Sequence, residues 1–332
     1  MSKWRFTKGL HDVGNGVYAY LQPDGTWGWS NAGLIESQGQ TLLVDTLMGV
    51  EITRDMIDEM KAKVPAAARI DTLVNTHANV DHFLGNEVVE GAEIIAAKLA
   101  AEEIAATNLD QMADVFEKKV DLGDAGAFLY ETMGRTFPVR GAKLTPPTRT
   151  FEKQLDLMVG DKPVKLIDLG PAHTKSDTVV YVPGDRIIFT GDLLFNEGTP
   201  VMWAGPVQSW IDAWDYMMSL DVEVIVPGHG PIATKADVRR QKEYFEFVRD
   251  EARKRFDAGM HWEEAARDIH LGAYARLSDA ERIVGNVFTL YREFGDPAAR
   301  VSEAHVFGAM QRWRAQVREA HDRHDHTNCS HG

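Results

Sequence analysis

The chain has 332 residues, of which 44% are hydrophobic, and this is enough for one large core or for a core and a smaller helical domain. A formal net charge of −14 and the lack of any dense run of lysine and arginine argue against a nucleic-acid-binding protein and against attraction to an anionic membrane. No stretch reaches the roughly 18 unbroken apolar residues of a membrane helix, residues 1–6 lack the apolar core of a secretory signal, and the single Cys329 excludes an internal disulfide. We therefore expect a cytoplasmic protein that binds neither nucleic acid nor membrane.

The N-terminal part of the chain predicts β-structure, because short apolar runs alternate with turn residues. The runs cover residues 17–21, 32–35 and 41–45, and the turns fall at residues 23–25 and 38–40. Trp27 and Trp29 follow the first turn, one on either side of a glycine. These two rings either fold over a nearby site and hold an apolar substrate or pack on the sheet.

A strand that ends in a polar cluster is the main functional signal of the sequence. A helix is predicted for residues 50–64, where apolar side chains recur every fourth residue until Pro65 stops the pattern. The apolar run 70–74 then predicts a buried strand, and it leads to residues 77–82, which hold two histidines, an asparagine and an aspartate. Imidazole nitrogens and carboxylate oxygens are the usual ligands of zinc and similar ions, so this cluster predicts a metal site at a strand tip.

The segment after this cluster interrupts the β pattern. A strand is predicted at residues 91–96, and residues 97–140 are then mostly helical, amphipathic and rich in alanine and charge. We interpret residues 97–140 as an insertion beside the site. Its large apolar side chains either line a substrate pocket or form ordinary core: Met112, Phe116, Phe128, Tyr130, Met133 and Phe137.

Three further polar clusters follow predicted strands in the second half of the chain. The strands cover residues 155–159, 164–168, 178–182, 186–190 and 222–226, with a helix at 209–220. The clusters are residues 170–177, residues 190–192 and His229, and each brings a histidine or aspartate to a strand end with a glycine nearby. One histidine at a strand end is weak evidence, but four such clusters in one chain predict a composite site.

Only helices are predicted beyond residue 233. Thr234 and Asp237 form the pattern of a capping box, Ser278 and Glu281 form a second one, and a third helix is expected at 302–320. The apolar faces of these helices must bury against the core or against another subunit, so a homodimer is one alternative. The polar, His-rich tail 321–332 is expected to be disordered and to lie outside the active site.

Taken in order, these clusters resemble the metallo-β-lactamase superfamily over about residues 12–233. The family's motif His-x-His-x-Asp-His is matched by His77-Ala78-Asn79-Val80-Asp81-His82, and His173, Asp192 and His229 fall where the family places its later ligands. The resemblance implies an α/β fold, a four-layer αβ/βα sandwich with the metals at one edge between two sheets. We therefore expect a catalytic domain at 1–233, which contains the insertion, and a C-terminal helical extension at 234–320.

The resemblance also implies the metal ligands. The first site would use His77, Asn79 and His173, the second would use Asp81, His82 and His229, and Asp192 would bridge them. Asn79 departs from the family, which has histidine at this position, and an amide oxygen is a poorer donor than imidazole. We therefore expect one tightly bound divalent ion and a second that is weak or absent. Zinc is the leading candidate, and manganese and iron remain alternatives.

A bound divalent ion would provide a nucleophilic water, with Asp81 placed to hold that water and move its proton. Asp45 and Asp168 either orient ligand histidines or cap strand ends. Lys175, two residues after His173, either meets an anionic group of a substrate or is an ordinary surface lysine. Trp203, on the loop that precedes the last histidine, is expected near the mouth of the site.

The leading functional hypothesis is a metal-dependent hydrolase that acts on an ester, lactone, amide or related bond of a small, partly apolar molecule. A phosphodiesterase or sulfatase of the same fold is an alternative, as is an iron-dependent oxygenase. A non-catalytic member, in which Asn79 marks a decayed site, is the third class. β-Lactamase activity itself is disfavoured, since the sequence shows no export signal.

Overall fold

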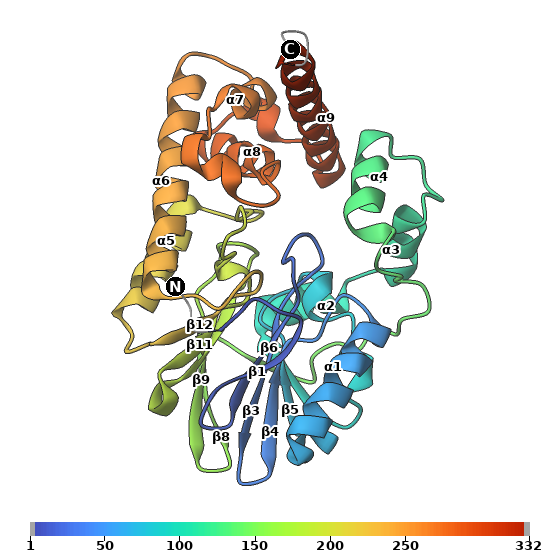
Figure 1. The fold of residues 1–332 in the computed structure, drawn as a ribbon, viewed down its shortest axis with the longest axis vertical. Coiled ribbons are helices and arrows are strands. Elements are labelled where there is room, and N and C mark those ends of the chain that lie inside the picture. The colour runs from blue at the N-terminus through green and yellow to red at the C-terminus, as the bar shows by residue number, and fades with distance from the viewer. Residues whose placement is uncertain (1–3, 329–332) are drawn as a thin grey trace.

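Two β-sheets packed face to face form the centre of the protein (Figure 1). The structure is a computed structural model that describes residues 4–328, without the side chains of residues 318–328. Within this range the first sheet contains, in spatial order, β1 (Gly9–Gly14), β2 (Val17–Leu21), β3 (Ala32–Ser37), β4 (Gln40–Val44), β5 (Thr72–Val74), β6 (Glu93–Ala97) and β7 (Arg149–Phe151). The second contains β12 (Val224–Val226), β11 (Ile187–Phe189), β10 (Thr178–Val182), β9 (Lys162–Asp168) and β8 (Gln154–Val159).

Alternation along the strands buries both faces of the first sheet. On β2, Val17 and Leu21 belong to the core between the two sheets, whereas Tyr20 faces the other way. There Tyr20 packs with Met56 and Met60 of α1 (Val50–Lys63). The apolar side chains that recur every fourth residue of this helix therefore face the sheet. The helix therefore forms an outer layer.

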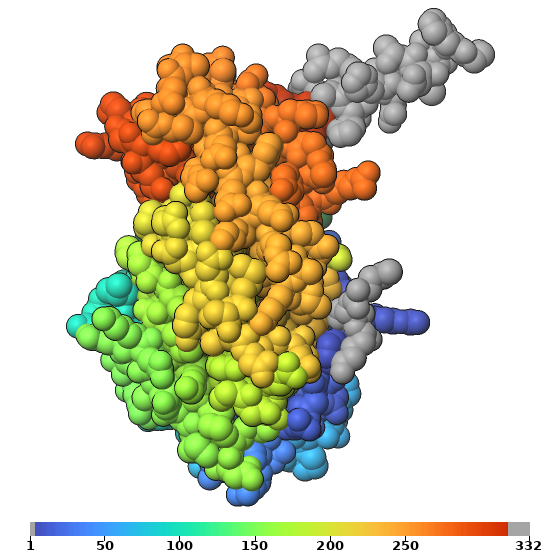
Figure 2. Space-filling model, turned by 90° about the vertical axis from the view of Figure 1, so that its left-hand side faces the viewer, coloured from blue at the N-terminus to red at the C-terminus, as the bar shows by residue number. Residues whose placement is uncertain are grey.

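Helices also cover the outer face of the second sheet. Ile188 and Ile225 on this face share a cluster with Trp210 and Trp214 of α5 (Val207–Ser219) and with Phe245 of α6 (Lys235–Asp257). Figure 2 shows the segment that contains α5 and α6 crossing this side of the molecule, from the sheets toward the helical end. The order helix, sheet, sheet, helix confirms the predicted four-layer sandwich.

The insertion and the C-terminal helices meet above one edge of the sandwich (Figure 1). The insertion contains α2 (Lys98–Ala105), α3 (Leu109–Phe116) and α4 (Asp124–Leu129), and the C-terminal region continues with α7 (Trp262–Asp268), α8 (Arg282–Phe294) and α9 (Glu303–Asn328). Phe307 of α9 stacks on Phe128 of α4 at 5.7 Å between ring centroids, and Arg312 pairs with Asp124 at 3.1 Å. Two segments that are distant in sequence therefore form one roof.

Several local predictions differ from the structure. The capping box at Thr234 and Asp237 is confirmed. The one at Ser278 and Glu281 is wrong, because α8 begins only at Arg282 and Ser278 lies before the helix, where its carbonyl accepts a hydrogen bond from the Thr199 N–H. Strands β1 and β7 and helix α7 were not predicted. Helix α9 continues to residue 328 and so includes much of the His-rich tail, while residues 329–332 lie outside the described residues.

The apolar faces of the C-terminal helices bury within the chain itself. Val238 and Val248 of α6 and Ile283 and Leu290 of α8 belong to the same cluster as the second sheet. The homodimer stays a prediction. Among the described residues, no helix combines the length and apolar character needed to span a bilayer.

Candidate metal centre

The predicted ligands gather at one edge of the sandwich, where neighbouring parallel strands end. Strands β4 and β5 run parallel in the first sheet, as do β11 and β12 in the second, and the 3.0 Å contact of His82 with Asp192 shows that the ends of both pairs meet at this edge. The residues that follow β5, β9, β11 and β12 carry the histidines and aspartates there. The side chains of His77, His82, His173, Asp192 and His229 are at most 3% exposed.

Two overlapping groups of these side chains could hold an ion. His77, His82 and Asp192 form one group, and Asp81, His82 and His229 form the other, with all ligand atoms of a group within 4.8 Å of one another. The Nε2 atom of His82 lies 3.0 Å from Asp192 Oδ1, and the Nε2 atom of His229 lies 3.3 Å from Asp81 Oδ2. His173 Nε2 lies 3.4 Å from Asp192 Oδ2. Asp192 therefore stands between the groups, as the bridging position requires.

Unsatisfied atoms in this centre fit a metal. His77 Nε2, His82 Nε2 and Asp192 Oδ1 are buried and form no hydrogen bond within the described part of the chain, although the last two atoms are close. Leaving a buried polar atom unpaired costs about 1–3 kcal/mol, so three such atoms within 4.8 Å of one another favour a bound ion. Imidazole nitrogens and a carboxylate oxygen are the donor set of zinc and related divalent ions.

Asp45 supports His82 from behind. Its Oδ2 atom lies 2.9 Å from His82 Nδ1, while Oδ1 accepts the backbone N–H of Thr76 at 2.7 Å. The backbone of Asp45 is left-handed, with φ 60°, and this unusual conformation turns the carboxylate toward both partners. The contact fixes the proton on Nδ1 and presents Nε2 to the centre. Asp168 has a different role, because it accepts hydrogen bonds from Ser176 and Asp177 and so shapes the loop that carries His173.

Backbone carbonyls orient the other two histidines. His229 Nδ1 lies 3.1 Å from the Gly25 carbonyl oxygen, and His173 Nδ1 lies 2.7 Å from that of Val201. A carbonyl only accepts, so in both rings Nδ1 carries the hydrogen and Nε2 presents its lone pair to the centre. Gly228 is required beside them, since a Cβ atom there would lie 2.0 Å from Asp192 Oδ1.

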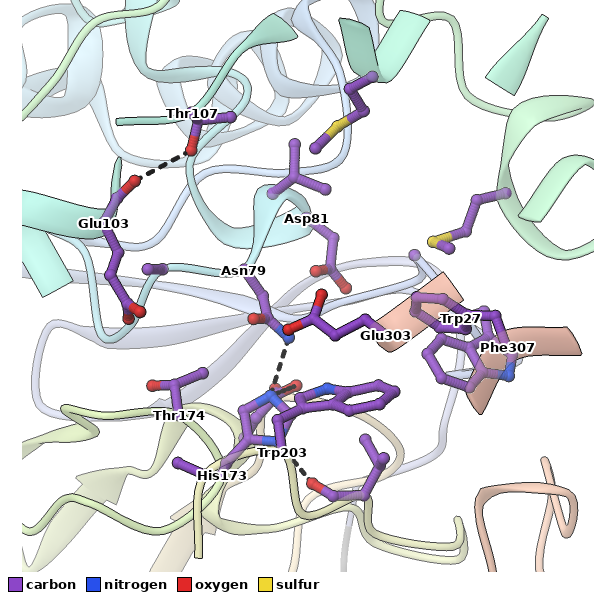
Figure 3. A pocket seen from close by; sticks show the side chains of 18 of the residues that line it. Trp27, Asn79, Asp81, Glu103, Thr107, His173, Thr174, Trp203, Glu303 and Phe307 are labelled. Carbon is purple, nitrogen blue, oxygen red and sulfur yellow. Dashed lines mark hydrogen bonds and ion pairs between the residues drawn. The ribbon is translucent and has the colours of Figure 1, made fainter. Parts of the chain in front are cut away.

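Asn79 already occupies the lone pair of His173. The Asn79 Nδ2 atom lies 2.9 Å from His173 Nε2, drawn as a dashed line in Figure 3. Because Nε2 has no hydrogen in this tautomer, the amide donates and the imidazole accepts. His173 Nε2 is accordingly absent from the unsatisfied buried atoms of the described residues. The centre thus has an open side at His77, His82 and Asp192 and a closed contact at Asn79 and His173.

Burial and neighbouring charges shift the titration of the centre. Burial lowers the pKa of His77 and of His173. Burial opposes protonation of His229 as well, but the Asp192 and Asp81 carboxylates outweigh it and raise its pKa to about 9. Burial disfavours the Asp81 carboxylate, yet His82 and His229 outweigh it and lower its pKa to about 2. The carboxylates thus hold protons on histidine that a metal would displace.

A cavity of about 1000 Å³ opens above the centre. One wall comes from the insertion and is apolar: Met112, Val115, Phe116, Leu129 and Met133. The other is aromatic, with Trp27, Trp203 and Phe307 in mutual contact, and their ring centroids are 5.4–6.5 Å apart. Figure 3 shows these three rings on one side and Asn79 and Asp81 beside them.

The predicted substrate residues behave differently from one another. Trp27, Lys175 and Trp203 line the cavity, and Lys175 forms a 2.5 Å ion pair with Glu103. Trp29 is not among the described lining residues, and its ring packs edge-on against Phe137 at 4.8 Å. The lining residues of the C-terminal helices were not predicted, because no motif marks them and only the tertiary packing of α8 and α9 brings them here: Arg282, Arg292, Glu303 and Phe307.

The comparisons with known proteins agree with this geometry. A family model described as the metallo-beta-lactamase superfamily matches residues 25–229. The chain belongs to the metallo-β-lactamase superfamily. This is a superfamily of metallo-hydrolases, and the matched range ends at His229, the last predicted ligand. The C-terminal helices that complete the cavity lie outside it.

Individual relatives share the fold at low sequence identity. The chain is 24% identical over 203 residues to the 2,4-dinitroanisole O-demethylase subunit alpha of Nocardioides sp. (strain JS1661). The aligned residues cover 59% of this chain and 51% of the relative. It is similar to the stereoselective inverting sec-alkylsulfatase Pisa1 from Pseudomonas sp., with a TM-score of 0.65, 17% identity, and coverage of 86% of this chain and 50% of that one. A metallo-beta-lactamase from Pontibacter korlensis matches with a TM-score of 0.53 and 20% identity over 71% of this chain and 98% of that one. The chain thus spans about half the length of the demethylase subunit and of the sulfatase.

Proposed function

We propose that the protein is a metal-dependent hydrolase that cleaves an ester, lactone, amide or related bond of a small molecule with an apolar, aromatic body. The observation that carries this proposal is the set of unsatisfied buried ligand atoms at the base of a cavity with apolar walls. The ion would be held chiefly by Asp81, His82, Asp192 and His229. Zinc fits this donor set best, and manganese and iron are the alternatives.

A divalent ion in this centre would supply Lewis-acid polarisation and a water acidic enough to act as a nucleophile near neutral pH. The protein's own contribution begins with Asp81, which is 9% exposed and lines the cavity. Its carboxylate is placed to orient a water toward the substrate and to accept the proton. Asp45 and the carbonyls of Gly25 and Val201 keep the imidazoles turned toward the centre throughout.

Asn79 limits the centre to one tightly bound ion. The amide hydrogen bond uses the His173 nitrogen that a first-site ion would need, and Asn79 itself offers no imidazole. A second ion would have to break this bond and accept a weaker donor set. We therefore infer a stoichiometry of one ion per chain under conditions without excess metal.

The aromatic wall supports an aryl group in the substrate. Aromatic side chains bind flat apolar groups by stacking and edge contacts worth about 0.5–1.5 kcal/mol each beyond area burial. The relative named for O-demethylation of 2,4-dinitroanisole, a substituted benzene, is consistent with such a substrate. A sulfatase is the second candidate, supported by the likeness to Pisa1 across 86% of this chain, which extends beyond the family match.

The test combines a substrate panel with one catalytic variant. Metal-defined protein is assayed on chromogenic aryl esters, lactones, amides, phosphodiesters and sulfates. Asp81→Ala is expected to lower kcat by about 100-fold or more on whichever class is turned over, since general-base assistance contributes roughly 10²–10⁴-fold. Asp161→Ala, which removes a carboxylate bonded to Ser37 on the far side of the sheets, is the matched control and should keep full activity. Full turnover by Asp81→Ala would refute the assigned mechanism.

A further inference from the structure

We propose that Glu303 selects substrates that carry a positively charged amino or ammonium group on their apolar body. This inference rests on the proposed function in one respect, namely that the cavity above the metal centre receives the substrate. Glu303 is the first residue of α9, far beyond the family match, which ends at residue 229.

Glu303 is exposed, and its carboxylate faces the cavity without a partner among the described residues. Figure 3 shows it directed toward the middle of the cavity, beside Asn79 and Asp81 and near the ring of Trp203. It forms no hydrogen bond or ion pair with any described residue, although its charge is one of the causes that raise the pKa of Lys175, after the Glu103 contact. The other acidic side chain at the rim, Glu103, is already paired with Lys175 at 2.5 Å.

The cationic side chains that line the cavity already have acceptors. Arg282 pairs with Asp279 at 3.0 Å, and Lys175 pairs with Glu103. Arg292 donates to the carbonyl oxygens of Trp203 and Ala204 at 2.8 and 2.9 Å. An anionic substrate would therefore meet cations that already have contacts, whereas a cationic one would find in Glu303 a carboxylate that has no partner among the described residues.

The metal centre adds negative rather than positive charge. Three carboxylates, those of Asp45, Asp81 and Asp192, lie in it or directly behind it. The ligand histidines are neutral when they hold a metal, so one divalent ion leaves this group with one net negative charge. Such a charge attracts cations and repels anions.

Two rings of the aromatic wall, Trp203 and Phe307, offer a surface for a cation. The Trp27 indole N–H donates to Glu281 Oε1 at 3.0 Å, and the Arg282 guanidinium already lies over the Trp27 ring at 4.2 Å, so this ring is fixed and carries a cation of the protein itself. The neighbouring rings of Trp203 and Phe307 are half-buried and line the cavity. A cation over an aromatic face gains about 0.5–2 kcal/mol, and a carboxylate opposite adds a direct ion pair.

A purely structural role for Glu303 predicts a different result. An acidic residue in the first turn of a helix stabilises the helix N-terminus by about 0.3–1 kcal/mol. In that case its replacement would lower thermal stability and would change the binding of all ligands alike. Charge selectivity of binding separates the two roles.

The experiment uses two aryl probes of opposite charge, phenyltrimethylammonium and benzenesulfonate, with affinities measured by calorimetry on zinc-loaded and on metal-free protein. The metal-free measurement removes direct contact of the sulfonate with the ion. We expect the ammonium probe to bind at least 10-fold more tightly than the sulfonate in both forms. Glu303→Gln should reduce this ratio at least 5-fold, whereas Glu264→Gln, an equal charge change on a residue of α7 that is also exposed but does not line the cavity, should leave it unchanged.

Two outcomes would overturn the proposal. One is equal or tighter binding of the sulfonate to the wild-type protein, and the other is a Glu303→Gln protein in which both probes weaken by the same factor. Neither outcome depends on turnover. A protein that hydrolyses aryl esters but shows no charge preference would contradict this inference alone, and a protein that prefers the cation but hydrolyses nothing would contradict only the proposed function.

Discussion

Asn79→His is the most informative single change in the centre. In the wild-type protein the Asn79 amide donates to His173 Nε2 over 2.9 Å, and this bond occupies the nitrogen that a first-site ion would need. The substitution removes the donor and adds an imidazole between two existing histidines. The expected result is an increase from about one to about two tightly bound ions per chain.

The size of the effect follows from two opposing contributions. Loss of the amide–imidazole hydrogen bond should destabilise the metal-free variant by about 0.5–1.5 kcal/mol. A newly bound ion at 100 times its dissociation constant stabilises the folded state by about 2.7 kcal/mol. The variant should therefore unfold at a lower temperature than the wild type when metal-free and at a higher temperature in excess zinc.

The assay is elemental analysis after gel filtration, together with the visible spectrum of the cobalt-substituted protein, which reports the ligand set of each ion. Asn79→Ala is the control, because it frees His173 Nε2 without adding an imidazole, and it should still hold one ion. Two ions retained by the wild-type protein under the same conditions, or only one retained by Asn79→His, would refute this role of Asn79.

Three further predictions concern the support of the centre, its protons and its cavity. Asp45→Asn should weaken zinc affinity by about 10- to 100-fold, because the new amide no longer fixes the His82 ring, and an unchanged affinity by competition with a chelator would exclude this role. Metal binding at pH 7 should release protons, since the pKa of His82 is raised and that of His229 is raised to about 9. The metal affinity should therefore fall as the pH drops below about 9. Calorimetry in buffers of different ionisation heat measures the released protons and would show none if these pKa shifts are absent. Trp27→Leu should raise KM for an aryl substrate severalfold with little change in kcat, and a loss confined to kcat would place Trp27 in the chemical step instead.

The sequence predicted the parts of the site that follow strand ends. A short apolar run followed by histidine and aspartate is a local pattern, and parallel pairing then brings such ends together. The bond between Asn79 and His173 was not predictable in this way, because it joins residues 94 positions apart and depends on ring orientation. Trp27 and Trp29 have nearly the same sequence context, and only the position of Phe137 turns one of them away from the cavity.

The roof of the cavity depends on tertiary packing that the sequence does not encode locally. The apolar pattern of residues 302–320 predicted a helix but not its contact with α4, and this contact decides that Glu303 and Phe307 reach the cavity. The same limit explains the missed strands. β7 has three residues, and β1 begins and ends with glycine, so neither forms a run that periodicity can detect.

Because the reactive centre lies on the sandwich and much of the cavity wall comes from the insertion and the last helices, catalysis and substrate preference depend largely on separate stretches of polypeptide. Mutations in the insertion and the last helices would change which compounds bind without disturbing the metal ligands. A chimera that carried the insertion and the C-terminal helices of another relative on this sandwich should keep its reactivity and acquire the substrate preference of the donor.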